Sequence, residues 1–375
     1  MSRYLVTGCA GFIGSHLTKA LLRRGDEVVG VDAFTDYYPR PAKESNLEGV
    51  REDANLSLVE LDLSTATLEP LLEGVDGVFH LAAQPGVRGS FGDTFADYVR
   101  DNIIVTQRLF ESVAAKGLRV VMASTSSVYG NAETYPTRED ATPRPVSPYG
   151  VTKLACEALA RTYGECFGLE AVLLRYFTVY GPRQRPDMAF ARVIDALLAE
   201  RRFTVYGTGE QSRDFTFVDD AVSATIAAME AGSSRTTYNV GGGSETTLND
   251  AIELCQKLAG TELDVINEAT ARGDVRRTGA DTTLIRTELG WRPETPLARG
   301  LALQLEAARA AVGTIYSVQK TIASTIPALS KIAPPTSASC RRREATNSVS
   351  DDAGSADGGI AASTTRNTEI VIAAK

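Results

Sequence analysis

Histidine and cysteine are scarce in this sequence, and the few that occur have no spacing that suits a metal ion. His16 and His80 are the only histidines among the 375 residues. Two isolated histidines and no cysteine cluster cannot supply the usual ligand sets, so we expect no metal site and interpret both histidines as packing residues. The five cysteines are odd in number and have no paired spacing, which indicates reduced thiols and a cytoplasmic location.

Basic side chains are outnumbered, and long apolar runs are missing. Lys and Arg together number 39 against 47 for Asp and Glu, so the formal net charge is -8. This balance argues against a nucleic acid or an anionic membrane as a partner. No apolar run is long enough to span a membrane. The first expected strand begins at residue 3 or 4, so we also expect no signal peptide.

The stretch near the N-terminus has the pattern of a dinucleotide-binding turn. An apolar run at residues 4–6 predicts a buried strand, Gly8, Gly11 and Gly14 follow it, and helix-forming residues occupy 15–23. Gly8 permits a tight turn, Gly11 lets a pyrophosphate approach the backbone, and Gly14 lets the helix pack against the strand. The free N–H groups at the start of the helix then face the phosphate charge.

A carboxylate at the end of the second predicted strand favours NAD over NADP as the cofactor. The strand at residues 27–31 is followed by Asp32, eighteen positions after Gly14. A carboxylate there accepts hydrogen bonds from both ribose hydroxyls and repels a 2′-phosphate. The sequence therefore predicts an NAD site.

Strand and helix patterns alternate through the first two-thirds of the chain, as a doubly wound parallel sheet requires. We therefore expect an α/β, Rossmann-type NAD-binding domain at residues 1–180. The longest predicted helices lie at residues 94–116 and 148–167. The predicted strands cover residues 3–7, 27–31, 56–61, 77–81, 119–123 and 170–175.

The pattern becomes irregular after residue 180, where segments shorten and glycines cluster. We expect residues 181–311 to form mainly a smaller α/β substrate-capping domain, closed by helices at 281–289 and 297–311. Residues 312–375 are rich in Ser, Thr and Ala. Such a segment cannot bury enough apolar surface to offset the entropy of ordering it, so we predict a disordered or weakly helical low-complexity tail.

Small and polar residues follow successive predicted strands. Since the carboxyl ends of parallel strands meet at one edge of the sheet, these residues are expected to contact the dinucleotide together. Asn102 lies in the long helix at 94–116 and is expected to fix the backbone near the site. The predicted cofactor-binding residues are Gly8, Gly11, Phe12, Ile13, Gly14, Asp32, Asp62, Leu63, Leu81, Ala82, Ala83, Asn102, Tyr149 and Lys153.

A tyrosine and a lysine in the second long helix have the spacing of a catalytic pair. Tyr149 and Lys153 are four positions apart and share one helix face. The lysine ammonium, near the phenol and near a ribose hydroxyl, and a positive nicotinamide ring would lower the pKa of the tyrosine from about 10. A phenolate at neutral pH is a competent general base. A hydroxyl of residues 124–127, at the end of the fifth strand, is expected to share the substrate proton.

These motifs resemble the extended short-chain dehydrogenase/reductase family, in its NAD-dependent nucleotide-sugar epimerase and dehydratase branch. Within that branch the similarity is closest to the UDP-glucuronate 4-epimerases and covers roughly residues 1–311. The segments that carry it are residues 8–14, 36–38, 80–88 and 175–188, together with the pair Tyr149 and Lys153.

The resemblance implies a role for each of several residues. It makes Tyr149 the base, Lys153 the group that tunes the pKa of the tyrosine, and Thr125 the hydroxyl partner, with Ser124 or Ser126 as alternatives to Thr125. It also implies that two arginines, Arg213 and Arg277, clamp the phosphates of a UDP-sugar, which suits the bidentate geometry of arginine. The alternative for either arginine is a surface ion pair. A homodimer built through the two long helices is expected as well.

The resemblance also narrows the reaction. A related 4,6-dehydratase carries an Asp-Glu pair after the catalytic threonine, and UDP-glucuronate decarboxylases carry a glutamate at the position of Ser127. This chain has Ser126 and Ser127 there. What remains is 4-epimerisation of UDP-glucuronate to UDP-galacturonate through a transient 4-keto sugar. The alternatives are a UDP-glucose or UDP-N-acetylglucosamine 4-epimerase and a non-catalytic, NAD-sensing binding protein.

A glucuronate substrate requires that its carboxylate be held away from alignment with the keto group, because a β-keto acid loses carbon dioxide readily in that geometry. The residues predicted to hold the carboxylate are hydroxyl donors and one cation. They are Ser126, Ser127, Thr178 and Arg185. The alternative is that the serines cap the strand end and that Arg185 is a surface charge.

Overall fold

A seven-stranded parallel sheet forms the centre of the structure, a computed structural model that describes residues 1–269 and 273–325. The strand order is β10-β6-β5-β4-β1-β2-β3. From β1 the chain builds the sheet in one direction through β2 and β3 and then returns to build it in the other. The expected α/β doubly wound fold is therefore confirmed. The strands are β1 (Arg3–Thr7), β2 (Glu27–Asp32), β3 (Leu56–Glu60), β4 (Gly77–His80), β5 (Arg119–Thr125), β6 (Glu170–Tyr176) and β10 (Thr237–Val240).

The seventh strand of the main sheet comes from the stretch that we expected to form mainly the smaller domain. β10 lies within the stretch 181–311 that we expected to cap the sheet, yet it pairs in parallel with β6. Helix α7 (Val218–Ala231) also returns to the main sheet, where it contacts α1 (Phe12–Arg23). Residues Met1–Thr321 form one compact unit, so residue 180 does not separate two bodies. A buried strand of four residues carries no mark of the sheet to which it belongs, which is why the sequence pattern misplaces it.

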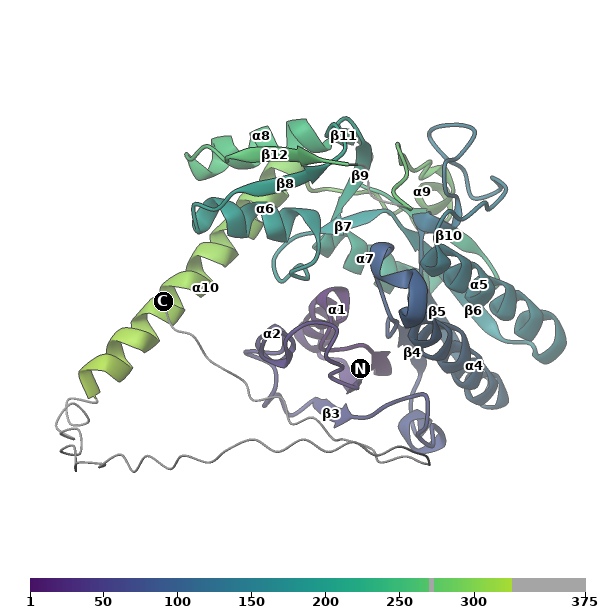
Figure 1. The fold of residues 1–375 in the computed structure, drawn as a ribbon. Helices are drawn as coiled ribbons and strands as arrows, with labels where there is room; N and C mark the ends of the chain where they lie inside the picture. The colour runs from purple at the N-terminus through teal and green to yellow at the C-terminus, as the bar shows by residue number, and fades with distance from the viewer. Residues whose placement is uncertain (270–272, 326–375) are drawn as a thin grey trace, which may run out of the picture. The chain divides into compact units, whose positions relative to one another are not determined.

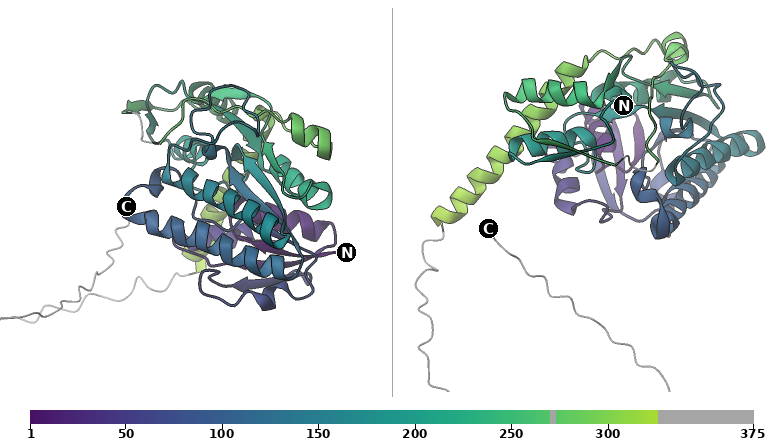
Figure 2. Two further views of the ribbon diagram at one scale, coloured as in Figure 1. Left: turned by 90° about the vertical axis from the view of Figure 1, so that its right-hand side faces the viewer. Right: turned by 45° about the horizontal axis from the view of Figure 1, so that its top comes forward.

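Alternate side chains of the central strands point to opposite faces of the sheet, and each face is covered by a pair of helices. α4 (Val105–Ala115) and α5 (Pro148–Phe167) cover one face and lie side by side in Figures 1 and 2. α1 and α7 cover the other face. The residues toward α4 and α5 include Leu5, Val78 and Val120, and those toward α1 and α7 include Val6, Phe79 and Val121.

Two small sheets and their helices lie outside the main sheet. One sheet has the order β11-β9-β7 and the other pairs β12 with β8. Helices α6 and α8 contact each other and these strands. The elements are β7 (Thr178–Tyr180), α6 (Ala189–Leu198), β8 (Phe203–Tyr206), β9 (Ser212–Phe217), β11 (Glu245–Thr247), α8 (Leu248–Ala259) and β12 (Val265–Glu268).

Of the two long helices predicted at 94–116 and 148–167, only the second has the bounds that the sequence pattern predicts. α5 has the predicted bounds, because Ser147 caps its start through a 3.1 Å hydrogen bond from the Gly150 N–H and Gly168 ends it in a left-handed conformation. The helix expected at 94–116 is instead α3 (Phe95–Tyr98), a π-helical turn (Val99–Ile104) and α4. A π turn adds one residue to a helical turn, and this kind of turn is frequent at functional sites.

The remaining helices are shorter or longer than expected. α9 (Thr283–Leu289) matches the predicted position, but α10 (Leu297–Thr325) continues beyond residue 311, so 312–325 are helical and not yet tail. The rest of the predicted tail, residues 326–375, lies outside the described residues. Helix α2 covers Arg40–Asn46, and short 3₁₀ turns lie at Glu69–Leu72, Arg88–Ser90, Gly92–Thr94 and Ser126–Val128. None of the helices in the described part of the chain has the length and hydrophobicity to cross a bilayer.

Candidate active site

A cavity of about 720 Å³ lies over the carboxyl ends of the central strands. It is lined by residues that follow β1, β2, β3, β4 and β5. β1 lies between β2 and β4, which is the switch point where open α/β sheets bind their ligands. Most of the residues that we predicted for the cofactor and the sugar line this one cavity.

The three glycines after β1 form a cradle in which Gly8 and Gly14 leave no room for a side chain. A Cβ atom on Gly8, whose φ is 72°, would lie 2.8 Å from the Ala82 backbone nitrogen, and one on Gly14 would lie 2.0 Å from the Gly8 carbonyl oxygen. Gly11 precedes the first residue of α1, Phe12, so the open N–H groups of the helix face the cavity. This geometry fits the pyrophosphate of NAD.

Asp32, at the end of β2, lies where the ribose of that dinucleotide would be. Its carboxylate accepts hydrogen bonds from the backbone N–H groups of Ala10 at 3.2 Å and Phe34 at 2.8 Å. Lys43 of α2 lies 3.4 Å from the same carboxylate and also lines the cavity. The sequence pattern did not indicate Lys43, because a lysine eleven positions after Asp32 has no spacing that marks it as a partner.

Asn102 is the predicted cofactor residue whose side chain does not line the cavity. It is buried in the π turn, where its Oδ1 accepts the Gln84 N–H at 2.7 Å and its Nδ2 donates to the Gln84 carbonyl at 3.1 Å. Nδ2 also donates to the Thr152 hydroxyl at 3.0 Å. Since Gln84 lines the cavity, Asn102 fixes the backbone of the loop after β4, as expected, without facing the cofactor itself. The other predicted cofactor residues all line the cavity: Gly8, Gly11, Phe12, Ile13, Gly14, Asp32, Asp62, Leu63, Leu81, Ala82, Ala83, Tyr149 and Lys153.

Thr125, Tyr149 and Lys153 face the same cavity from two elements. Thr125 ends β5, and the other two lie in the first turns of α5. Burial raises the pKa of Tyr149, while the nearby charge of Arg185 and a hydrogen bond with Thr125 act to lower it. Burial also lowers the pKa of the Lys153 ammonium. The strongest cationic influence on the phenol is thus Arg185 and not Lys153, which differs from the expectation drawn from the helix spacing.

The predicted sugar-binding hydroxyls and Arg185 lie together with the tyrosine. Ser126, Ser127, Thr178 and Arg185 all line the cavity. The Arg185 side chain is 18% exposed and hydrogen-bonds both carboxylate oxygens of Asp187, at 3.0 and 2.9 Å. Arg185 is therefore not a surface charge, and Asp187 is a cavity residue that we did not predict.

The two arginines expected to hold the phosphates do not line the cavity. Arg277 is half exposed and pairs with Glu245 at 2.6 and 2.9 Å, so it forms the surface ion pair that was the alternative. Arg213 lies 3.7 Å from Asp274, and Asp274 does line the cavity. The arginines that line it are Arg88, Arg100, Arg185 and Arg192. Of these, Arg88 belongs to the segment 80–88 that carried the resemblance.

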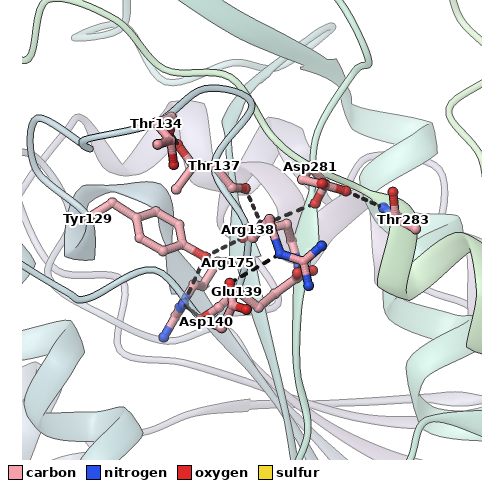
Figure 3. A network of polar contacts seen from close by, with 10 residues as sticks. Tyr129, Thr134, Thr137, Arg138, Glu139, Asp140, Arg175, Asp281 and Thr283 are labelled. Atoms are coloured by element: carbon pink, nitrogen blue, oxygen red, sulfur yellow. Dashed lines mark hydrogen bonds and ion pairs between the residues drawn. The ribbon is translucent and has the colours of Figure 1, made fainter.

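A buried polar network lies directly behind the catalytic strand end. Arg175 donates to Glu157 through Nε at 3.0 Å and Nη2 at 2.7 Å, and to the Tyr129 hydroxyl at 2.7 Å. Figure 3 shows Arg175 beside Tyr129, with Glu139 next to it. Glu157 also accepts the Ser124 hydroxyl at 2.5 Å. The network therefore ties α5 and β6 to the end of β5, which carries Thr125.

Both histidines have packing roles, as predicted. His80 is buried between the hydroxyls of Thr7 at 2.9 Å and Thr106 at 3.0 Å, and burial together with the charge of Lys153 lowers the pKa of the ring to about 3. His16 bonds the Pro182 carbonyl at 2.9 Å. Across residues 1–269 and 273–325, no three His, Cys, Asp or Glu side chains are grouped as a metal site would require.

Comparison with known proteins gives the family. Residues 4–241, more than half of the chain, match the NAD dependent epimerase/dehydratase family. The chain belongs to this family. The resemblance found in the sequence is therefore confirmed.

Three relatives of this NAD-dependent epimerase/dehydratase family member illustrate the similarity. UDP-glucuronic acid 4-epimerase from Bacillus cereus, solved with UDP-glucuronic acid and NAD, is 40% identical with a TM-score of 0.80, over 82% of this chain and 99% of the other. An uncharacterised UDP-glucose epimerase of Bacillus subtilis, YtcB, is 40% identical over 81% of this chain and 96% of its own. UDP-glucuronate 4-epimerase of Thermodesulfobacterium geofontis is 35% identical over 85% of this chain and 100% of its own.

Proposed function

We propose that the protein is an NAD-dependent 4-epimerase that converts UDP-glucuronate to UDP-galacturonate. The observation that carries the proposal is a single cavity that holds a general base, Tyr149, beside a partly buried cation, Arg185. The base suits a sugar hydroxyl, and the cation suits a sugar carboxylate. Two relatives that share 40% and 35% of their residues with this chain are UDP-glucuronate 4-epimerases, which supports the same substrate here.

Different cavity residues have different roles in the proposed reaction. Bound NAD supplies an acceptor for the hydride of sugar carbon 4 and returns that hydride to the opposite face of the ring. The glycine cradle at residues 8–14 and Asp32 hold the dinucleotide. Tyr149 takes the proton of the 4-hydroxyl, and Thr125, hydrogen-bonded to the phenol, shares that proton. Lys153, buried one turn further along α5, orients the ribose.

The hydroxyl cluster and Arg185 protect the intermediate. A 4-keto glucuronate is a β-keto acid, and it loses carbon dioxide when the bond to its carboxylate aligns with the carbonyl π system. Ser126, Ser127 and Thr178 offer hydroxyl donors, and Arg185 offers a cation, within the same cavity as the base. Held by these groups, the carboxylate stays out of alignment while the ring turns over.

A UDP-glucose 4-epimerase is the second candidate, and one observation favours it. Arg185 is paired with Asp187, so the local charge that a sugar meets is close to balanced and would also tolerate a neutral hydroxymethyl group. The relative YtcB is named a UDP-glucose epimerase. A non-catalytic, NAD-sensing protein is disfavoured, because Thr125, Tyr149 and Lys153 are all present and face one cavity.

One experiment separates these candidates. Purified protein is incubated with UDP-glucuronate and, separately, with UDP-glucose, and the sugars are analysed for the galacto epimers, pentose and carbon dioxide. We expect UDP-galacturonate as the main product from the acidic substrate, with little pentose. Faster epimerisation of UDP-glucose would favour the second candidate, and no product from either substrate would favour the binding protein.

Arg185→Ala tests the role of the cation in the same assay. We expect kcat/KM for UDP-glucuronate to fall by about 10²-fold, because a charge-assisted bidentate pair with the carboxylate is lost. For UDP-glucose the loss should be less than tenfold. Equal losses on the two substrates would contradict a carboxylate-binding role for Arg185.

We further propose that the protein works as a homodimer in the cytoplasm. The adjacent helices α4 and α5 and the π turn before α4 carry exposed apolar side chains, among them Ile104 at 45%, Val151 at 48% and Phe167 at 65%. A second copy of the same helices would cover them in a four-helix interface.

The buried thiols of Cys9, Cys156 and Cys255 are free, which suits a reducing compartment.

The dimer can be tested by light scattering. The protein is expected to show twice the chain mass of 40.0 kDa. Val151→Glu places a charge at the centre of the proposed interface and should shift the mass toward the monomer at micromolar concentration. Val265→Glu is the control, since Val265 is an exposed valine of β12. A monomeric wild type, or equal effects of both variants, would contradict this interface.

A further inference from the structure

Arg185 and Asp187 form a pair with a defined geometry inside the cavity. Arg185 donates from Nε to one oxygen of Asp187 at 3.0 Å and from Nη2 to the other oxygen at 2.9 Å. Two parallel bonds of this kind fix both the position and the plane of a guanidinium group. Both residues line the cavity, as does Met188, which follows them in the chain.

The pair uses only one edge of the guanidinium. Nε and one hydrogen of Nη2 face Asp187, and the Tyr37 hydroxyl shares a further hydrogen bond with the guanidinium. A guanidinium carries five N–H donors. These contacts use three of the five, so the guanidinium keeps N–H donors for another carboxylate. Asp187 does not prevent Arg185 from binding another carboxylate. It determines which edge of the Arg185 guanidinium faces that carboxylate.

A third side chain supports the carboxylate of the pair. Tyr37, in the loop after β2, donates its hydroxyl to Asp187 at 3.4 Å, and the Arg185 guanidinium lies 5.9 Å from the Tyr37 ring. Gly86 packs so closely against this hydroxyl that a Cβ there would lie 2.4 Å from it. Loops after β2, β4 and β7 thus converge on Asp187, and its orientation does not depend on its own short segment alone.

We propose that Asp187 is a positioning residue that sets the guanidinium plane of Arg185 for the carboxylate of an acidic sugar and so protects the keto intermediate from decarboxylation. The inference rests on the proposed function, because it assigns the part of the site that distinguishes an acidic from a neutral sugar. Asp187 acts through Arg185, whose guanidinium it holds by two hydrogen bonds. If Asp187 is replaced, Arg185 keeps its positive charge, but its guanidinium group is no longer held in one plane by the two hydrogen bonds.

The consequence of a misplaced carboxylate follows from the chemistry of the intermediate. If the bond from carbon 5 to carbon 6 aligns with the C4 carbonyl, that bond breaks and carbon dioxide leaves. The electron pair remains on carbon 5 and spreads onto the C4 oxygen as an enolate. A proton from solvent restores carbon 5, and return of the hydride held by the reduced cofactor gives a UDP-pentose. Pentose is therefore a direct readout of how well the carboxylate is held.

Asp187→Asn tests the proposal with little change in volume. The amide offers one acceptor and one N–H donor, so one of the two hydrogen bonds becomes a contact between two donors. We expect kcat/KM for UDP-glucuronate to fall about tenfold and that for UDP-glucose to change less than twofold. We also expect the pentose share of the products from UDP-glucuronate to rise at least fivefold. A merely structural role would lower both activities and leave that share unchanged.

Two further variants make the result specific. Tyr37→Phe removes the hydroxyl that supports Asp187 and should shift the pentose share in the same direction by a smaller factor. Asp195→Asn is the matched control, because Asp195 also pairs with an arginine, Arg201, but both side chains are exposed and neither lines the cavity. It should leave both activities and the pentose share unchanged.

The outcomes separate the inference from the proposed function. If wild-type protein does not epimerise UDP-glucuronate, both are overturned. If the wild type does and Asp187→Asn lowers turnover of both substrates equally, or leaves the pentose share at the wild-type level, only the inference is overturned. A selective loss on UDP-glucuronate accompanied by pentose supports it.

Discussion

Tyr149→Phe is expected to lower kcat by about 10²–10⁴-fold while NAD remains bound. The substitution removes one oxygen atom, and that oxygen is the group that takes the proton of the 4-hydroxyl. The ring itself is retained, so its edge contact with Tyr98, at 6.3 Å between ring centres, should persist. The glycine cradle and Asp32 are untouched. Product formation is measured by chromatography of the UDP-sugars, and retained NAD by its release on denaturation.

Tyr163→Phe is the control for this prediction. Tyr163 lies on the same helix, α5, but its hydroxyl bonds Gln107 and Glu111, and the residue does not line the cavity. Its removal should leave kcat within about twofold of the wild-type value. If Tyr149→Phe kept most of the wild-type activity, another group would have to be the base. If it lost both activity and NAD, the effect would be one of folding or binding instead of proton transfer.

Arg175→Met is expected to destabilise the protein by about 3–5 kcal/mol. Arg175 and Glu157 are both buried, with side chains 7% and 3% exposed, and share two hydrogen bonds. Methionine fills much of the same volume but leaves the Glu157 carboxylate without its cation. The buried hydroxyl of Tyr129 also loses a donor. The melting temperature should fall by roughly 5–10 °C, which scanning fluorimetry or circular dichroism measures.

Two comparisons make this second prediction specific. In Arg138→Met the lost partner is Asp140, and because both side chains of that pair are exposed, no measurable change in melting temperature is expected (Figure 3). The double variant Glu157→Leu with Arg175→Met removes both buried charges, and it should be more stable than Arg175→Met alone. A double variant that is less stable than either single variant would show that the network does more than compensate charge.

Most of the predicted cofactor-binding residues were identified from local sequence patterns. The glycines at 8, 11 and 14 have fixed spacing because each meets a nearby backbone atom, and Tyr149 and Lys153 share a face because one helical turn joins them. These relations are set within a few residues, so they are visible in a single sequence. The same locality explains the accurate bounds of α5, which begins after a capping serine and ends at a glycine.

Contacts that depend on the tertiary geometry could not be predicted in this way. Lys43 beside Asp32 and Asp187 beside Arg185 are short steps along the chain, yet nothing in their spacing marks them as partners. The sequence does not distinguish Arg277 from Arg192, because both are arginines with no marked spacing. Only Arg192 lines the cavity, since Arg277 pairs with Glu245 of β11. The π turn at Val99–Ile104 lies inside the helix predicted at 94–116, because its apolar pattern is the same as that of an α-helix.

The sequence alone determined the fold class, the dinucleotide cradle and the family, because these depend on periodicity and on residues close together in the chain. The tertiary structure alone decided that β10 completes the main sheet, that Arg277 lies outside the cavity and that Arg185 is the cation that most affects the pKa of Tyr149. The physical reason is that burial and charge act through space. Each side chain's environment is set by loops from several strands, and those loops meet only when the sheet has formed.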